Sequence, residues 1–294
     1  MPGWSEIMNE VQQHKQEDVP AFLLDECIGY LNNIKTLTGR NVIAYYSGWL
    51  KNNNPEVSIN ENDKNAFMNA VIGMDRAKGL DLILHTPGGD IAATEGIVTY
   101  LQSLFNSDIR AIIPQISMSA GTMIAISCKE IIMGRQSSLG PIDPQMQGIA
   151  CQMVIDEFKR AVEEVKNEPA SLGLWQTIIG KYPVTFLTSC EDAIHWSEGL
   201  AEEWLAKVDP NINIDKIKET FINHNHSYSH SRRISRENCR NAGLKISDLE
   251  KNQELQDAVL SLHHCYMILM DNIPALKLVM TPEGRAYIQT KQGR

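Results

Sequence analysis

The chain lacks the marks of secreted, membrane-spanning and zinc-bound proteins. Its six cysteines are dispersed without any CxxC pair, which argues against a disulfide framework and against a zinc site. No stretch approaches the roughly 20 apolar residues that cross a bilayer. Residues 1–18 are polar and have neither the basic start nor the apolar core of a secretory signal. These absences predict a cytoplasmic protein with reduced thiols and no transmembrane segment.

Basic residues are few relative to acidic ones. The 27 Lys and Arg residues face 36 Asp and Glu residues, which gives a formal net charge of −9. Because binding to phosphate backbones relies on clustered Lys and Arg, we expect no nucleic-acid partner. The 43% hydrophobic content over 294 residues is enough for a substantial buried core.

Residues 41–134 alternate between strand-like and helix-like patterns. Apolar runs at 41–46, 82–84, 111–113 and 130–134 predict strands, with helices between them, so we expect an α/β fold with a parallel sheet. Beyond about residue 210 the composition becomes more polar, and a long helix is expected over residues 249–271. We therefore expect an N-terminal helical segment (1–40), an α/β core (41–209) and a helical C-terminal extension (210–294).

Two short turns carry the chemistry of this sequence. Residues 85–90 have the sequence HTPGGD and residues 117–122 have the sequence SMSAGT. Each turn follows an expected strand and opens an expected helix. Since ligand sites of open α/β sheets lie at the carboxyl ends of the strands, the two turns are expected to meet in one site.

Acyl transfer requires a nucleophile, a base and donors for the oxyanion. Consecutive glycines expose backbone N–H groups, so Gly89 is a candidate oxyanion donor. Ser119, at the tip of a strand-to-helix turn, is the candidate nucleophile, and the following Ala120 N–H is the second donor. Ser117 lies nearer the strand and is the weaker choice. The alternative for Ser119 is a simple helix N-cap.

Together these motifs resemble the serine dehydrogenase proteinase family of the Clp protease and crotonase fold, alongside signal peptide peptidase A. The resemblance implies a superhelical ββα core, a Ser119 nucleophile, an oxyanion hole at Gly89 and Ala120, and a homo-oligomer in which the 249–271 helix is a candidate packing element. It spans about the whole chain and is carried by residues 45–49 (YYSGW), 85–89 (HTPGG), 117–125 (SMSAGTMIA) and 138–145 (SLGPIDPQ), and more weakly by 230–234 (HSRRI), 242–244 (AGL) and 262–264 (LHH).

The general base is the missing part. Clp-type peptidases place a histidine about 25 residues after the serine, where this chain has Asp143 and Pro144, and no histidine lies between Ser119 and His195. Signal peptide peptidase relatives use a lysine whose pKa is lowered by burial. Lys159, and less favourably Lys166, are the candidates on the next expected helix, and the alternative for each is an exposed surface lysine.

His85 is a second candidate base because it adjoins the glycine turn, although a structural histidine that hydrogen-bonds the loop is the better explanation. His195 and His230 can enter the site only through tertiary folding. Asp143 either orients a base or braces its proline-rich loop.

The remaining histidines do not indicate a metal. Their spacings fit no zinc pattern, and we expect no metal and no cofactor; these residues are His224, His226, His230, His263 and His264.

The sequence therefore favours an ATP-independent serine peptidase-like hydrolase that cleaves peptides or unfolded protein segments through Ser119. Two alternatives stay open. One is a crotonase-like acyl-CoA enzyme or binder, because the same oxyanion geometry stabilises enolates. The other is a catalytically inactive scaffold of the same fold, which the missing base would explain.

Overall fold

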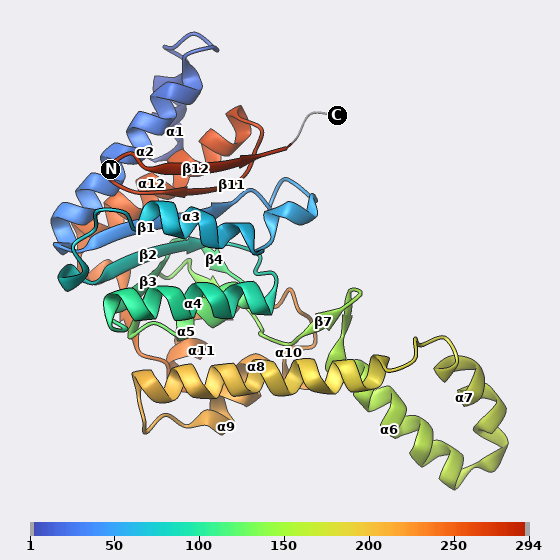
Figure 1. The fold of residues 1–294 in the computed structure, drawn as a ribbon. Helices are drawn as coiled ribbons and strands as arrows, with labels where there is room; N and C mark the ends of the chain where they lie inside the picture. The colour runs from blue at the N-terminus through green and yellow to red at the C-terminus, as the bar shows by residue number, and fades with distance from the viewer. Residues whose placement is uncertain (1–2, 292–294) are drawn as a thin grey trace.

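The computed structural model describes residues 3–291, except for the side chains of Asn225 and His226. Its centre is a seven-stranded mixed sheet with the strand order β10-β5-β3-β2-β1-β11-β12 (Figure 1). The expected α/β class is therefore confirmed. The superhelical arrangement stays a prediction.

Five neighbouring strands of this sheet are parallel to one another, and the two pairings at its β12 edge are antiparallel. The parallel strands are β1 (Asn41–Ser47), β2 (Leu80–His85), β3 (Ile109–Ile113), β5 (Glu130–Met133) and β10 (Ile246–Asp248). Antiparallel pairing adds β11 (Ala275–Met280) to β1 and β12 (Ala286–Thr290) to β11. The four strands predicted from the apolar runs are present.

Helices cover both faces of the sheet, which explains the continuous apolar runs of the strands. Along β1, Ile43 and Tyr45 enter one core, whereas Val42, Ala44 and Tyr46 enter the other. The first core is closed by α3 (Asn62–Ala70), α4 (Ile91–Phe105), α5 (Ala120–Ile126) and α8 (Phe186–Val208). The second is closed by α1 (Trp4–Val11), α2 (Val19–Thr38) and α12 (Gln253–Asn272).

The segment after residue 209 differs from the expected helical extension, and that expectation is corrected. It contributes β10, β11 and β12 to the main sheet, and α12 packs in the same core as α2. The physical reason is the apolar run of β11, which pairs with β1 and leaves no separate helical unit. The boundaries at residues 40 and 209 stay predictions.

Short elements connect the sheet to the candidate site. A three-stranded sheet joins β4 (Ile116–Ser117), β6 (Ser138–Leu139) and β9 (Ile234–Ser235), and a hairpin joins β7 (Gln145–Met146) to β8 (Ile149–Ala150). The other short helices are η1 (Pro55–Val57), η2 (Arg76–Lys78), η3 (Pro169–Ser171), α9 (Ile214–Ile217), η4 (Lys218–Ile222), α10 (His224–Ser227), α11 (Arg236–Ala242) and η5 (Leu249–Lys251).

A helical arm extends away from the sheet. It consists of α6 (Cys151–Asn167), α7 (Leu172–Ile179) and the first part of α8 (Figure 1). A small core holds α6 against α8 through Cys151, Val154, Phe186 and Cys190. The arm is thus anchored at its base and exposes much of its length.

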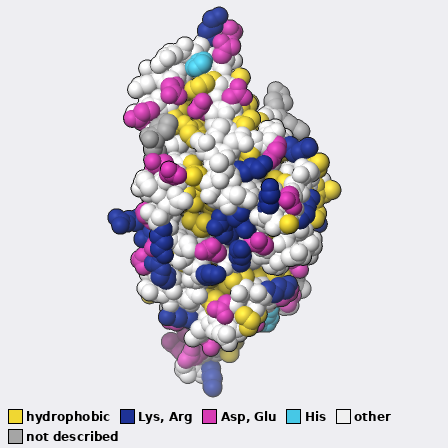
Figure 2. Space-filling model, turned by 90° about the vertical axis from the view of Figure 1, so that its left-hand side faces the viewer, with side chains coloured by type: hydrophobic (Ala, Val, Ile, Leu, Met, Phe, Trp, Pro, Cys, Tyr) yellow, Lys and Arg dark blue, Asp and Glu magenta, His cyan; other side chains and the backbone are white. Residues whose placement is uncertain are grey.

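The surface carries charges of both signs. Figure 2 shows Lys and Arg side chains interspersed with Asp and Glu on the face that it presents. No helix of the described residues has the length and apolar character that a bilayer crossing requires.

Candidate functional site

Ser119 lies in a strained turn between β4 and α5. Its backbone has φ +50° and ψ −119°, a conformation that side-chain-bearing residues rarely adopt. Every residue of α5 is buried, whereas Ser119 is partly exposed. The sequence thus folds into the expected strand-to-helix turn, with the serine at its accessible tip.

The glycine turn after β2 is in direct contact with the Ser119 turn. A Cβ atom at Gly88 would lie 2.7 Å from Ser119 Cβ and 2.8 Å from Ala120 N, so only a glycine allows this approach. The φ of Gly88 is +90°, which also favours glycine. The structure therefore brings the two predicted turns together.

On its other side the glycine turn pairs with Ile59. The Ile59 N–H donates to Gly88 O at 2.8 Å, and the Asp90 N–H donates to Ile59 O at 2.9 Å. Within the described part of the chain, the Gly89 and Ala120 N–H groups donate to no backbone carbonyl. Both groups are thus available to a bound oxygen atom.

A cavity of about 500 Å³ opens at these two turns. Apolar side chains alternate in its wall with a few polar groups, which is typical of ligand sites. It is lined by Ser58, Pro87, Gly88, Gly89, Asp90, Ile91, Ser119, Ala120, Met123, Ile142, Pro144, Gln145, Met146, Ala193, Ser197 and His230.

The proline-rich loop after β6 is fixed to α5 by Thr122. The Thr122 hydroxyl accepts from the Gly140 N–H at 3.0 Å and lies 2.9 Å from Gly140 O. Asp143, three residues further, is buried beside the cavity. Thr122 therefore connects α5, which follows Ser119, to the loop that carries Asp143.

Asp143 holds two histidines. His230 Nδ1 lies 2.7 Å from Asp143 Oδ1, and His224 Nδ1 lies 2.6 Å from Asp143 Oδ2. Gln145 Nε2 also donates to Asp143 Oδ2, at 2.9 Å. His230 is the member that lines the cavity, and its side chain is 33% exposed. The arrangement holds an imidazole in the wall of the cavity that Ser119 also lines, with Nδ1 engaged by Asp143.

The cavity unites some of the predicted site residues and not others. Ser119, Gly89 and Ala120 line it together. Lys159 and Lys166 are exposed on α6, His195 is exposed on α8, and none of these three lines the cavity. The Asp143 carboxylate contacts two histidines, and its role as the group that orients a base stays a prediction.

His85 is fully buried in β2 rather than part of the cavity wall. Its ring lies 5.3 Å from the Tyr46 ring and 5.2 Å from the His263 ring, measured between centroids. The pKa of His85 is lowered to about 4, mainly because burial disfavours the charged ring; the Ile116 backbone opposes this shift and the Arg233 charge adds to it. This position suits a structural histidine.

Metal ligation is not evident among the described side chains. No group of three or more His, Cys, Asp and Glu residues there could hold a metal ion. The side chain of His226, part of the histidine cluster considered from the sequence, lies outside the described residues.

A buried ion pair near the cavity was not predicted from the sequence. Lys277 of β11 donates to Asp63 Oδ2 and to Ser58 O, both at 2.8 Å. The side chains of Lys277 and Asp63 are each 1% exposed. A single lysine within the apolar run of β11 was the signal in the sequence.

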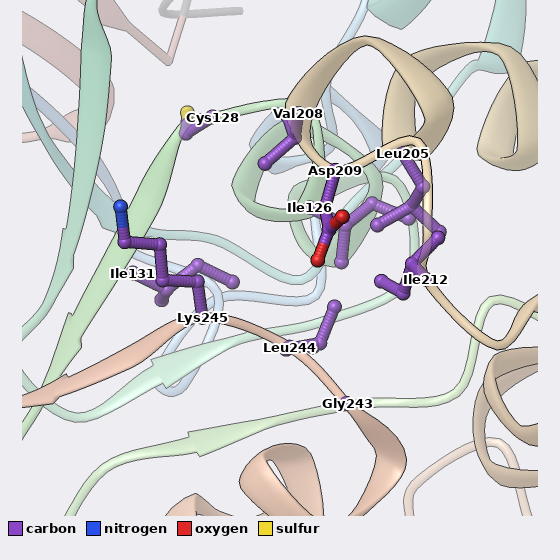
Figure 3. A pocket seen from close by; sticks show the side chains of 10 residues that line it. All are labelled: Ile126, Cys128, Ile131, Leu205, Val208, Asp209, Ile212, Gly243, Leu244 and Lys245. Carbon is purple, nitrogen blue, oxygen red and sulfur yellow. The ribbon is translucent and has the colours of Figure 1, made fainter.

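A second, smaller cavity of about 240 Å³ lies between α8, β5 and the residues after α11. In Figure 3 the Asp209 carboxylate lies among aliphatic side chains, and the Lys245 amine points away from it. This cavity shares no lining residue with the Ser119 cavity. The larger cavity, which holds the reactive groups, is therefore the candidate active site.

Comparison with known proteins finds similarity over part of the chain. Two uncharacterized proteins of Methanocaldococcus jannaschii are similar to part of the chain: one is 37% identical over 89 residues, and the other is 38% identical over 84 residues. The matches cover 30% and 29% of this chain and the same shares of the two relatives, so the chain spans less than a third of either relative's length.

A family match covers residues 57–174, fewer than half of the 294 residues. These residues include the glycine turn, Ser119 and Asp143, whereas His230 and Lys277 lie beyond them. Over residues 57–174 the chain matches the ClpP-like SDH-type serine proteinase family, the family that its motifs resemble.

Proposed function

We propose that the protein is a serine peptidase-like hydrolase that cleaves peptides or unfolded protein segments. Ser119 is the nucleophile, His230 is the general base, and Asp143 orients His230. One observation carries the proposal: a histidine bound through Nδ1 to a buried aspartate lines the same cavity as a serine in a strained turn. His230 thus takes the role for which the sequence suggested Lys159 or His85.

The contacts of His230 define how it acts. Its Nδ1–H donates to the Asp143 carboxylate, so Nε2 carries the lone pair that accepts a proton. As the Ser119 oxygen bonds to the carbonyl carbon of the substrate, its proton moves to Nε2. Asp143 then stabilises the imidazolium ion by its negative charge.

The backbone donors act on the charge that develops next. The substrate carbonyl oxygen becomes negative in the tetrahedral intermediate and accepts hydrogen bonds from the Gly89 and Ala120 N–H groups. The C–N bond then breaks, and the imidazolium gives its proton to the leaving amine. Water, deprotonated by His230, hydrolyses the acyl-Ser119 ester and restores the hydroxyl group.

The surface and the sequence motifs support three further parts of the proposal: a homo-oligomer, a superhelical core and an activity that needs no ATP. A homo-oligomer fits the apolar side chains exposed on the arm, among them Val162 (73% exposed), Leu174 (62%) and Val184 (90%). The family resemblance supports a superhelical core and an activity that needs no ATP.

A fluorophosphonate probe tests the site. Ser119 Oγ displaces fluoride from the phosphorus atom while His230 accepts the hydroxyl proton. We expect mass spectrometry to find the phosphonate on Ser119, and we expect no labelling of Ser119→Ala. Ser197→Ala is the matched control because Ser197 lines the same cavity, and it should be labelled normally.

The same probe tests the base. His230→Gln should be labelled at least about 100-fold more slowly, since general base catalysis contributes about 10² to 10⁴ in rate. His195→Gln, an exposed histidine on α8, should be labelled at the wild-type rate. An unlabelled wild-type protein, or full-rate labelling of His230→Gln, would contradict the proposed mechanism.

A further inference from the structure

An ion pair is buried beneath the wall of the Ser119 cavity. Lys277 on β11 and Asp63 on α3 lie 2.8 Å apart, Nζ to Oδ2, and each side chain is 1% exposed. Asp63 Oδ2 also accepts from the Tyr45 hydroxyl at 3.1 Å and from the Asn60 N–H at 2.9 Å. The carboxylate is thus held by both the sheet and the start of α3.

The ammonium group reaches from this pair to the chain segment at the cavity. Lys277 Nζ donates to the carbonyl oxygen of Ser58 at 2.8 Å, and Ser58 lines the cavity. The next residue, Ile59, bonds to Gly88 O and to the Asp90 N–H. Three consecutive contacts therefore connect Lys277 to both sides of Gly89.

Gly89 has little room to move within this arrangement. A Cβ atom at Gly89 would lie 2.3 Å from Ile59 O and 2.4 Å from Ile59 N, which shows how closely the two backbones are packed. Any displacement of the Ile59 segment therefore moves the Gly89 peptide.

Stability alone does not explain a charged pair at this position. Burying two charges carries a large desolvation penalty, and well-packed apolar residues often replace such pairs without loss of stability. What an apolar pair cannot do is donate a hydrogen bond to the Ser58 carbonyl. The ammonium group supplies this contact, and Asp63 balances its charge.

We propose that Lys277, held by Asp63, is a positioning residue that fixes the Ser58–Ile59 segment and thereby aims the Gly89 N–H at the oxyanion. The catalytic part of this inference rests on the proposed function. The positioning itself does not, because it concerns the backbone around Gly89.

Hydrogen exchange of the full-length protein tests the positioning directly. In Lys277→Met, the amides of Ile59 and Asp90 should exchange at least about tenfold faster, because their hydrogen bonds to Gly88 O and Ile59 O lose the support of the Ser58 contact. Lys51→Met is the control, since Lys51 pairs with Asp271 at the surface and should leave both amides protected. Unchanged exchange at Ile59 and Asp90 in Lys277→Met would overturn the proposal.

Peptide hydrolysis tests the catalytic consequence. A misdirected donor should lower kcat of Lys277→Met by about 10- to 100-fold and change KM by less than about twofold, because the contact acts on the transition state. A rise in KM as large as the fall in kcat, or an unchanged kcat, would contradict the catalytic part of the inference. If the wild-type protein hydrolyses nothing, the proposed function fails, while the exchange measurement still decides the positioning.

A double variant separates positioning from folding. Asp63→Asn combined with Lys277→Met removes the unpaired charge, so its Tm should recover relative to Lys277→Met. Its kcat should stay low and its Ile59 and Asp90 amides should stay fast, because the Ser58 contact is still absent. Recovery of kcat together with Tm would show a merely structural role. If Lys277→Met does not fold, the double variant alone provides both measurements.

Discussion

Asp143 Oδ1 accepts a hydrogen bond from His230 Nδ1 at 2.7 Å, across 87 residues of sequence. Asp143 occupies the place where a Clp-type chain is expected to have its histidine. The aspartate therefore comes second in the chain, and the histidine comes third, from a distant segment. The same three roles recur in other chain orders on unrelated folds, so the order does not weaken the proposal.

Asp143→Asn should slow phosphonate labelling of Ser119 by about 10² to 10⁴-fold, because the amide no longer holds His230 in the required tautomer or stabilises its charged form. The measurement is the labelling rate at saturating probe, with Tm as a check of folding. Asp192→Asn, an exposed aspartate on α8, should be labelled at the wild-type rate. Equal rates in Asp143→Asn and wild type would remove Asp143 from the mechanism.

Ser119→Gly should be more stable than Ser119→Ala by about 1 kcal/mol. The turn requires φ +50°, which strains alanine and serine alike but not glycine, and such strain costs about 1–3 kcal/mol before the greater flexibility of unfolded glycine is subtracted. Urea unfolding of the two variants gives the difference. If Ser119→Ala is the more stable variant, the strained turn is not a feature of the folded protein.

Gly88→Ala should lose phosphonate labelling by at least about 100-fold, because its Cβ would meet Met118 O, Ser119 Cβ and Ala120 N at less than 3 Å and push the two turns apart. Gly199→Ala is the control: nothing lies within 4 Å of its Cβ in α8, and removing a helical glycine should add about 0.5–1 kcal/mol of stability. Labelling rates and urea unfolding of both variants decide the matter. Normal labelling of Gly88→Ala would show that the turns do not touch.

Acid should destabilise the protein through two buried histidines. Burial lowers the pKa of His85 to about 4 and that of His263 to about 3, from an ordinary value of 6.5. Between pH 6.5 and pH 4 the unfolded chain binds more protons than the folded chain. The free energy of unfolding therefore falls as the pH drops from 6.5 towards 4. His85 alone should account for about 3 kcal/mol over that interval.

Urea unfolding at several pH values checks this dependence. His85→Gln and His263→Gln should each show a smaller loss of stability between pH 6.5 and pH 4 than the wild type, whatever their absolute stability. His14→Gln serves as the control because His14 is exposed. An unchanged slope in both buried variants would mean that these histidines are not kept neutral by folding.

The parts predicted well from sequence are those in which chemistry and local pattern coincide. Apolar runs such as that of β2 sit in the buried middle of the sheet, and the glycine turn follows β2 as expected. The Ser119 turn was expected directly after the strand at 111–113, and it follows the short strand β4 instead. Their contact could be anticipated because parallel strands end on one side. A glycine is required at position 88 because the two turns are packed so closely that a Cβ atom does not fit.

What the sequence could not provide were contacts made across long separations. His230 lies in a polar segment with no regular pattern, and nothing local indicates that Asp143 receives it. Lys277 interrupts an apolar strand, but its partner Asp63 lies far from it in the sequence. For Lys159 the helical pattern gave a face but not the direction of the arm, which carries it away from the cavity.

The antiparallel pairing of β1 with β11 has a consequence for biosynthesis. Ser47 is opposite Lys277, so one edge of β1 stays unpaired until the entire intervening sequence has been translated. Long-range pairings of this kind close slowly and leave nascent chains open to aggregation. The ammonium group beneath Ser58 also arrives with β11. The nascent polypeptide therefore carries Ser119 and its glycine turn long before the cavity wall is complete, and a ribosome-bound chain is expected to be inert.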